Sequence, residues 1–418
     1  MQERVTFIHS GDIHLGAPFR GLRALSPVWA DRLATAIPDA YDEVIQACID
    51  EQVDFLLLAG DVFDTDKPSY AHYRRFLAGL KRLESRKIPV YIIAGNHDPF
   101  STWHAVVDDL PSNARLLPSD APSFSVFEKD GRPCALIAAR GFSNMEKGAD
   151  IADGMTRAAA EHACGVEAPF CIGMLHSGLW MDPYKAPTSE KELLAADMDY
   201  WALGHIHKSY LTPAHDPRIA FCGCIQGRDI KETGPRGCLK VTLAKGEPNK
   251  VEFIATSQVE WGRVRVDVSE CAGSDAVVAA CVRAAFAENA GGSCEEMVVR
   301  IVLEGATPLH KMLSDPVALE TLRTELNESY PSFYCDALVC ETTPLRDKEK
   351  IAASSTFEGT LLRCFASDAD DAALLSYLQG EFAARGLTVP RRVASHLDEI
   401  ATRAEDTALS LLEEGRSR

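Results

Sequence analysis

Residues 54–64 read DFLLLAGDVFD, an apolar run that ends in a glycine followed by Asp61 and Asp64. Such a continuous apolar run is typical of a strand buried on both faces of a parallel sheet. Similar runs lie on either side of it in the chain, at residues 4–10 and 89–94. The periodicity of residues 30–51 and 69–86 predicts helices between these runs, and the resulting β-α-β-α-β order predicts parallel strands.

Polar motifs stand where the predicted strands end. HSGDIHLG occupies residues 9–16, GDVFD residues 60–64 and GNHD residues 95–98. CIGMLHSG at 171–178 and WALGHIH at 201–207 close two later strands in the same way. Because open α/β sheets bind ligands outside the carboxyl ends of their strands, we expect these motifs to form one site.

A second series of strands predicts a second sheet. One helix is expected in its later part, because Ser189 and Glu192 form a capping-box pattern. Two mixed sheets packed face to face with helices outside, a four-layer αββα sandwich of the α/β class, fit this order best over residues 1–258. The expected strands of the second series are 123–127, 134–140, 169–175, 199–203, 219–223, 237–243 and 250–256.

The rest of the chain predicts two further parts. Residues 259–345 form a smaller α+β capping domain, and residues 346–350 (RDKEK) are expected to be a solvated linker that opens a helical C-terminal segment, 346–418. The last helix is either a surface helix or one that docks on a partner. In the cap we expect strands at 263–268, 297–303 and 334–341 and helices at 274–288 and 315–328, and in the tail helices at 357–366, 369–384 and 390–414.

The composition limits the classes of protein to which this chain can belong. The chain has 418 residues and thirteen scattered cysteines with no CxxC pair, which favours buried thiols in a reducing cytoplasm. No apolar run approaches the roughly 20 residues that span a bilayer, and the N-terminus lacks the organisation of a signal peptide. The net charge of −18 argues against loose coating of nucleic acid. It does not exclude cleavage of phosphodiesters, because surface charges are screened over about 8 Å.

The strand-end motifs predict a metal site. The candidate ligands are carboxylates, an amide oxygen and imidazoles without a thiolate, a set that suits manganese, iron or zinc. Residues two apart in extended backbone point to the same side, so Asp12 with His14, and His205 with His207, can each aim two ligands at one point. The alternative is that these are core histidines, and we expect His9 to be either such a residue or a support for the ligands. Burying two carboxylates without a cation would be unfavourable, which favours metal. The complete candidate set is Asp12, His14, Asp61, Asn96, His176, His205 and His207.

The pattern D-x-H, GD-x-x-D, GNHD, H and GH-x-H resembles the calcineurin-like metallophosphoesterase superfamily over residues 5–256. The residues within these motifs resemble those of the SbcD-type branch of DNA repair nucleases. Residues 221–238, FCGCIQGRDIKETGPRGC, are similar to the YhaO-like exonucleases of bacteria. The resemblance implies the metallophosphoesterase fold and a centre of two divalent ions, with Mn²⁺ first and Fe²⁺ or Zn²⁺ as alternatives.

The resemblance also assigns roles by motif position. One ion would take Asp12, His14, Asp61 and His207, and the other Asp61, Asn96, His176 and His205, with Asp61 between the two. His97 would stand over the scissile phosphate as a catalytic residue. Asp98 would orient His97 and Asp64 would support the ligands, although both aspartates could instead cap turns.

By resemblance, the function is that of a metal-dependent DNA exonuclease in double-strand-break repair. The alternative is a phosphatase or a (cyclic) nucleotide phosphodiesterase of the same superfamily. Phosphatases that resemble the pattern carry arginine after GD-x-x-D and end the next motif in glutamate, whereas this chain has Thr65 and Asp98 at those positions. Arg228 and Lys231 are candidates for phosphate contacts, or belong to a solvated face.

The implied partners are DNA and an SbcC-like coiled-coil ABC-type ATPase. The candidate docking segment for the ATPase is 369–414, and a homodimer would form through helices near 69–110. No membrane partner is expected.

Overall fold

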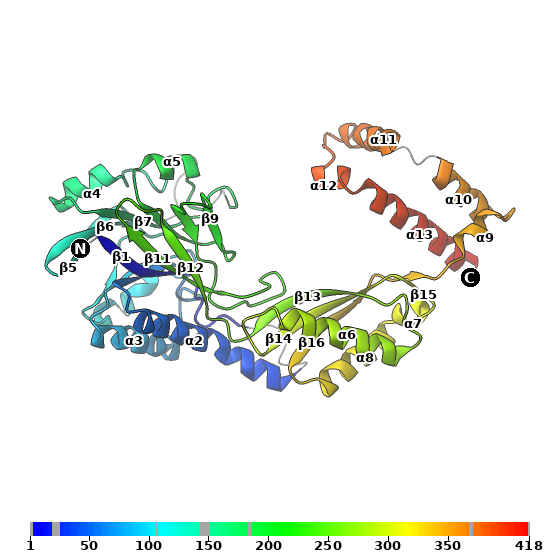
Figure 1. Ribbon diagram of the computed structural model, residues 1–418, viewed down its shortest axis with the longest axis horizontal. Coiled ribbons are helices and arrows are strands. Elements are labelled where there is room, and N and C mark those ends of the chain that lie inside the picture. Colours follow the sequence, from blue (N-terminus) through cyan, green and yellow to red (C-terminus); the bar gives the residue numbers. More distant parts are fainter. Residues whose placement is uncertain are drawn as a thin grey trace. The chain divides into compact units, whose positions relative to one another are not determined.

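The computed structural model describes residues 3–18, 26–105, 107–142, 150–182, 185–367 and 371–416 (Figure 1). The chain divides into two compact units. The first comprises Met1–Val264, Ala285–Arg300 and Ser329–Asp336, and the second Arg265–Ala284, Ile301–Glu328 and Ala337–Arg418. The predicted boundaries at 258 and 345 stay a prediction.

The first sheet of unit 1 contains the apolar strand that begins at Phe55. Its order is β12-β11-β1-β2-β3-β4. Strands β1 to β4 run parallel, while β11 is antiparallel to β1 and to β12, so the sheet is mixed as expected. The strands are β1 (Arg4–Ser10), β2 (Phe55–Ala59), β3 (Val90–Ile93), β4 (Ala114–Leu116), β11 (Gly237–Ala244) and β12 (Lys250–Ala255).

The second sheet has the order β5-β6-β7-β8-β10-β9. Its strands β6, β7, β8 and β10 are parallel, and β5 and β9 are antiparallel edge strands, so this sheet is also mixed. The strands are β5 (Ser123–Lys129), β6 (Arg132–Arg140), β7 (Phe170–His176), β8 (Tyr200–Gly204), β9 (Tyr210–Thr212) and β10 (Ile219–Phe221).

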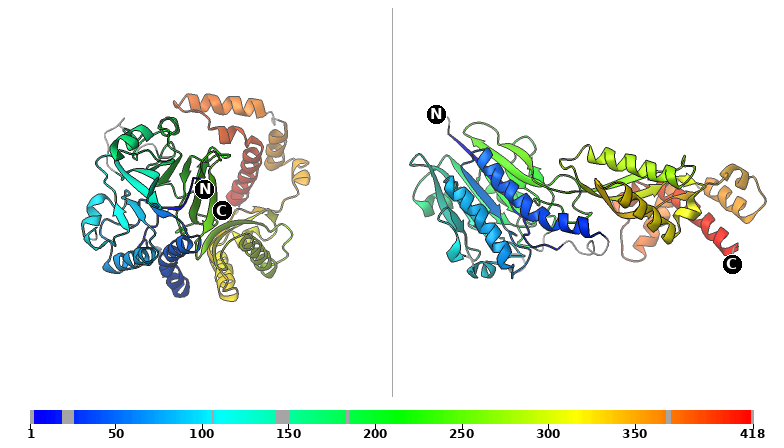
Figure 2. Two further views of the ribbon diagram at one scale, coloured as in Figure 1. Left: turned by 60° about the vertical axis from the view of Figure 1, so that its left-hand side comes forward. Right: turned by 90° about the horizontal axis from the view of Figure 1, so that it is seen from below.

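Alternate residues of each strand serve different layers, which confirms the αββα sandwich. Phe55 and Leu57 pack in a core shared with Ile172 of the second sheet. Leu56 and Leu58 belong to a different core that includes α2 (Pro27–Asp50) and α3 (Tyr70–Ser85). Figures 1 and 2 show these two helices side by side along the first sheet. On the outer face of the second sheet, Trp201 shares a core with α4 (Arg157–Cys164) and α5 (Glu190–Ala195).

Several short elements depart from the sequence-based expectation. Helix α4 was not predicted, although Thr156 caps its start and Gly165 ends it in the left-handed conformation. Strands β4 and β9 have only three residues each, too few for a periodic signal. The expected helix at 390–414 is divided into α12 (Arg391–Ala394) and α13 (Leu397–Arg416).

The remaining described elements include a three-stranded sheet of order β13-β14-β16. It comprises β13 (Glu260–Asp267), β14 (Met297–Glu304) and β16 (Phe333–Cys340), accompanied by α6 (Ser274–Asn289) and α8 (Pro316–Ser329). The tail contains α9 (Lys348–Ala352), α10 (Phe357–Ser367) and α11 (Asp371–Ala383) as well as α12 and α13. The smallest elements are η1 (Phe100–Ala105), η2 (Val107–Asp109), β15 (Ala306–Thr307), α7 (His310–Leu313) and β17 (Thr343–Pro344).

The linker predicted at 346–350 is more ordered than its charge suggests. The Arg346 side chain is only 4% exposed and pairs with Glu413 of α13 at 2.8 Å. Lys348 pairs with Glu405 and Asp406 of the same helix. These ion pairs, which charge composition alone does not reveal, fasten the start of the tail to its last helix.

All thirteen cysteines are free thiols, and most are buried. Within the described residues, no helix has the length and apolar character needed to cross a membrane.

Candidate metal centre

Glycines at the strand ends allow three turns to meet closely. A Cβ on Gly95 would lie 2.1 Å from Asp61 Oδ1, and one on Gly60 would lie 2.5 Å from His176 Nδ1. The backbone itself is strained there, because Asp12, Asp61 and His205 have φ angles of 49°, 49° and 100°. Non-glycine residues held at positive φ cost about 1–3 kcal/mol each and gather at functional sites. Bringing these turns together therefore lowers the stability of the fold.

Asp12, His14 and His207 form a first cluster, in which one ligand atom of each lies within 4.8 Å of the others. The Nδ1 atom of His14 lies 3.0 Å from Asp64 Oδ1, and that of His207 lies 2.6 Å from Glu232 Oε1. A carboxylate only accepts, so His14 donates its Nδ1 proton to Asp64. His207 Nδ1 faces the Glu232 carboxylate at 2.6 Å and the Arg228 guanidinium at 3.0 Å, and the shorter contact favours a proton on Nδ1 that is donated to Glu232. The two Nε2 atoms then face each other at 3.1 Å. Only a shared proton or a cation can satisfy both.

Asp61, His176 and His205 form a second cluster of the same kind. His176 donates from Nδ1 to Ala59 O at 2.8 Å, and its Nε2 lies 3.0 Å from Asn96 Oδ1. His205 is held through Nε2 by Asp182 Oδ2 at 3.1 Å, which leaves its Nδ1 facing Asn96 Oδ1 at 2.8 Å. Electron-rich atoms thus converge here as well, and the arrangement fits a cation.

Asp61 lies between the two clusters. Its Oδ2 is 3.8 Å from His14 Nε2 and 3.4 Å from His176 Nε2. Its Oδ1 accepts from the backbone N–H of His97 at 2.8 Å, which fixes the direction of the carboxylate. One carboxylate thus faces ligand atoms of both clusters, as a bridging ligand must.

The charges of the buried side chains at the centre favour the binding of a positive ion. Burial lowers the pKa of His176, but the charge of Asp61 and the hydrogen bond with it, together with Asp12 and the Ala59 carbonyl, raise it to about 9. Burial raises the pKa of Asp61, but His176, His14 and the backbone N–H of His97 together lower it below its usual value, so the group remains a carboxylate. Two divalent ions suit this set of carboxylate, amide and imidazole donors.

The extended backbone that the spacing of the motifs suggested is not what brings these candidate ligands together. Asp12 and His14 do share a cluster, but their φ angles of 49° and 54° are left-handed rather than extended. His205 and His207 do not aim at one point, because they belong to different clusters. The left-handed turn at His205 separates the directions of the two rings.

His97 and Asp98 occupy very different environments. The His97 side chain is 43% exposed, and its Nδ1 lies 3.1 Å from the backbone oxygen of Asp64. Asp98 is fully buried and accepts from the backbone N–H groups of Gly95, Asp61, Val62 and Phe63. The expectation that Asp98 orients His97 is therefore wrong. Asp98 holds two turns together, and Asp64 is the residue beside His97.

Three residues that support the ligands were not assigned that role from the sequence. Asp182 and Glu232 orient His205 and His207, and Arg228 contacts Asp64 at 3.1 Å and Glu232 at 3.3 Å. Burial lowers the pKa of Arg228, but Glu232, Cys224 and Asp64 together raise it above its usual value, so the ion pair is retained. Arg228 is thus engaged with the carboxylates that orient His14 and His207, whereas Lys231 is exposed. The stretch GRDIKETG was the only sequence signal for this arrangement.

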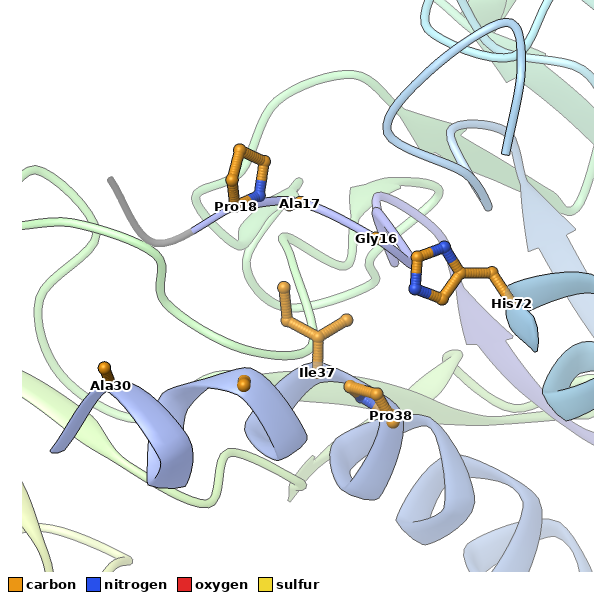
Figure 3. A pocket seen from close by; sticks show the side chains of 8 residues that line it. Gly16, Ala17, Pro18, Ala30, Ile37, Pro38 and His72 are labelled. Carbon is orange, nitrogen blue, oxygen red and sulfur yellow. The ribbon is translucent and has the colours of Figure 1, made fainter. Parts of the chain in front are cut away.

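A pocket of about 300 Å³ lies beyond the His14 motif (Figure 3). The His72 ring forms part of its wall and packs on the backbone of Gly16, where a Cβ would lie 2.6 Å from the ring. Ile37 and Pro38 of α2 also line the pocket.

Two family models match the sequence. Residues 5–209 match the model described as calcineurin-like phosphoesterase, and residues 261–344 match the middle domain of the metallophosphoesterase YhaO. The uncharacterized metallophosphoesterase YhaO of Bacillus subtilis is 36% identical over 311 residues, which cover 73% of this chain and 72% of that protein. The chain belongs to the calcineurin-like phosphoesterase family.

Two relatives with a described role are more distant members of this family. The DNA double-strand break repair protein Mre11 of Thermoplasma acidophilum is 26% identical, over 62% of this chain and 65% of that protein. The SbcD component of the nuclease SbcCD from Escherichia coli K12 is 24% identical, over 59% of this chain and 66% of its own length. Family membership makes the chain a hydrolase of phosphoester bonds with a dimetal centre, and confirms the resemblance seen in the motifs.

Proposed function

We propose that this phosphoesterase is a metal-dependent DNA exonuclease that acts in double-strand-break repair. The observation that carries the proposal is the pair of clusters joined by Asp61, with the exposed ring of His97 next to them. The relation to Mre11 and to the SbcD component of SbcCD supports DNA as the substrate.

The ligand roles follow the two clusters. Asp12, His14 and His207 would hold one ion, His176, His205 and Asn96 the other, and Asp61 both. When bound, two divalent ions supply positive charge that stabilises the phosphoryl transition state and makes water a better nucleophile. The surplus of positive charge at the centre explains how an acidic protein can hold a DNA phosphate.

His97 acts on the leaving group. Its ring is 43% exposed and belongs to neither of the two clusters, although it lies with His14 and Asp64 in a third group of possible metal ligands. Its Nδ1 is occupied by the contact with Asp64 O at 3.1 Å. The Nε2 atom is then the one that donates a proton to the departing sugar oxygen. A positioned general acid accelerates such a step by about 10²–10⁴-fold.

A diester is favoured over a monoester by the residue that comes after Asp64. Phosphatases of similar pattern place an arginine there, whereas this chain has Thr65, which hydrogen-bonds the Asp66 carboxylate. A terminal phosphate would lack the guanidinium that neutralises its extra charge. A phosphatase or nucleotide phosphodiesterase activity is the second candidate.

The substrates can be separated in one experiment. Full-length protein, freed of metal and reloaded with Mn²⁺, should hydrolyse labelled DNA and bis-p-nitrophenyl phosphate much faster than p-nitrophenyl phosphate. Imidazole-rich sites favour Mn²⁺ over Mg²⁺, so Mg²⁺ should restore less activity. If p-nitrophenyl phosphate is hydrolysed faster than the diesters, the protein is a phosphatase. If mononucleotide diesters are hydrolysed but DNA is not, it is a nucleotide phosphodiesterase.

Partners form the last part of the proposal. The helices α11 to α13 dock an SbcC-like coiled-coil ATPase, and α3 with the segment to residue 110 forms a homodimer. Tyr377 and Leu387, which are 65% and 58% exposed, provide apolar surface in the tail. The proposed place of action is the cytoplasm, in keeping with free thiols.

A further inference from the structure

Trp180 is an exposed tryptophan close to the second metal cluster. Its side chain belongs to a residue that is 62% exposed, whereas Trp29, Trp103, Trp201 and Trp261 are at most 6% exposed. The chain contains five tryptophans, so Trp180 differs from all the others. Leaving an indole in water forgoes the free energy that burial would give, and such residues are enriched where a partner covers them.

The indole is held in place although it is exposed. Its Nε1 donates to Glu190 Oε1 at 3.1 Å, and the same oxygen accepts from the Tyr210 hydroxyl at 3.1 Å. The rings of Trp180 and Tyr210 meet edge to face, with centroids 6.1 Å apart and planes at 81°. The hydrogen bond and the ring contact restrict the rotamers of Trp180 before any ligand binds. A ligand that contacts the indole therefore costs less side-chain entropy.

The loop that carries Trp180 begins and ends at the second cluster. It leaves β7 at His176, and two residues after Trp180 the Asp182 carboxylate contacts His205. The N–H groups of Met181 and Asp182 both donate to Gly178 O at 3.0 Å, so the loop is a closed turn. Two residues span at most about 7 Å, so the backbone of Trp180 lies within that distance of Asp182, whose carboxylate contacts a histidine of the second cluster.

We propose that Trp180 stacks on an unpaired nucleobase next to the scissile phosphodiester. The inference rests on the proposed DNA hydrolysis and specifies its substrate class. A base inside a duplex has neighbours on both faces, whereas a base in a single strand offers a free face to an aromatic ring. Every base has such a face, so the contact tolerates any sequence. The preferred substrate is therefore a single-stranded end rather than a closed duplex.

The test compares substrates with and without bases. Mn²⁺-loaded full-length protein is given a single-stranded oligonucleotide and a matched oligonucleotide whose terminal nucleotides are abasic. Trp180→Ala should raise KM for the base-bearing strand about 10- to 100-fold, with a smaller change in kcat, the loss expected for one stacked base. The KM ratio between the two substrates should fall toward 1 in this variant. Trp180→Phe should restore most of the ratio, and Phe253→Ala, which removes another exposed ring, should leave it as in the unmodified protein.

Fluorescence gives a second readout that does not depend on turnover. In the His97→Ala background, binding of oligothymidylate should quench the exposed indole, and Trp180→Phe should abolish most of this quenching. If DNA is hydrolysed but Trp180→Ala leaves the KM ratio and the quenching signal unchanged, the stacking role is overturned and Trp180 faces a protein partner. If the unmodified protein hydrolyses bis-p-nitrophenyl phosphate but no DNA, the proposed function fails together with this inference.

Discussion

His14 and His207 direct their Nε2 atoms at one another because Asp64 and Glu232 hold their Nδ1 atoms from behind. Without a cation or a proton between them, two lone pairs would face each other in a mostly buried site. The same logic applies at Asn96, whose oxygen is approached by ring nitrogens of both His176 and His205. At the residue scale, therefore, the orienting carboxylates determine where an ion can lie.

Glu232→Gln tests this orienting role. The amide accepts a weaker hydrogen bond from His207, and Arg228 loses one of its two carboxylate partners. Loss of such an orienting group costs about 10–100-fold in metal affinity. Calorimetric titration with Mn²⁺ should show this weakening at one of two sites, while Glu128→Gln, a change of equal charge on exposed β5, should bind as the unmodified protein does. If both variants bind Mn²⁺ with the same affinity, Glu232 does not orient a metal ligand.

Asp61→Ala tests the shared ligand. Because Asp61 Oδ2 faces ligand atoms of both clusters, its loss should weaken both ions, and the number bound per chain should fall below two. Metal analysis after dialysis measures this number, and circular dichroism checks that the variant is folded. Retention of two tightly bound ions would contradict a bridging role.

At the scale of elements, the sequence predicted the sheets well because their signal is local. The run from Phe55 to Ala59 is apolar at every position, which only a strand buried on both faces requires. The three-residue strands β4 and β9 carry no comparable pattern and were missed. The motifs that end the strands led to candidate ligands that the fold brings into two clusters. Their orienting partners were not, because Asp182 and Glu232 approach from loops whose position depends on the whole fold.

Gly95→Ala tests the close approach of two strand ends. An added Cβ would lie 2.1 Å from Asp61 Oδ1 and 2.3 Å from Asp61 N, so the turn or the carboxylate must move. Such overpacking costs about 1–3 kcal/mol, and metal affinity should fall with it. Gly273→Ala is the matched control, since nothing lies within 4 Å of its added Cβ. A thermal melt and a Mn²⁺ titration check both effects; no difference between the two variants would show that the turn tolerates a side chain.

At the scale of the molecule, family membership and a net charge of −18 must be reconciled with DNA as the proposed substrate. Surface fields fade over about 8 Å at physiological salt, so a phosphate at the centre responds mainly to the ions and ligands there. The basic residues of α3 offer less than their number suggests, because Arg75 pairs with Asp39 and Arg82 hydrogen-bonds Gln46. Binding should therefore depend on the site and a partner rather than on a broad basic surface.

The tail gives a prediction about that partner. Tyr377→Asp combined with Leu387→Asp places two charges on apolar surface of the helical tail, and should abolish co-purification with an SbcC-like ATPase of the same organism. Val317→Asp, at a position that is 76% exposed on α8, is the control and should still co-purify. Co-purification of the double variant at an undiminished level would place the ATPase elsewhere.

The most direct test of the central claim is digestion of end-labelled DNA by Mn²⁺-loaded full-length protein and by His97→Ala. We expect the unmodified protein to shorten the strands from their ends. His97→Ala should be slower by about 10²–10⁴-fold while still binding two ions, because the ring lies outside both ligand sets. His162→Ala, an exposed histidine of α4, should digest DNA normally. Intact DNA after incubation with the unmodified protein, or loss of metal in His97→Ala, would contradict the account.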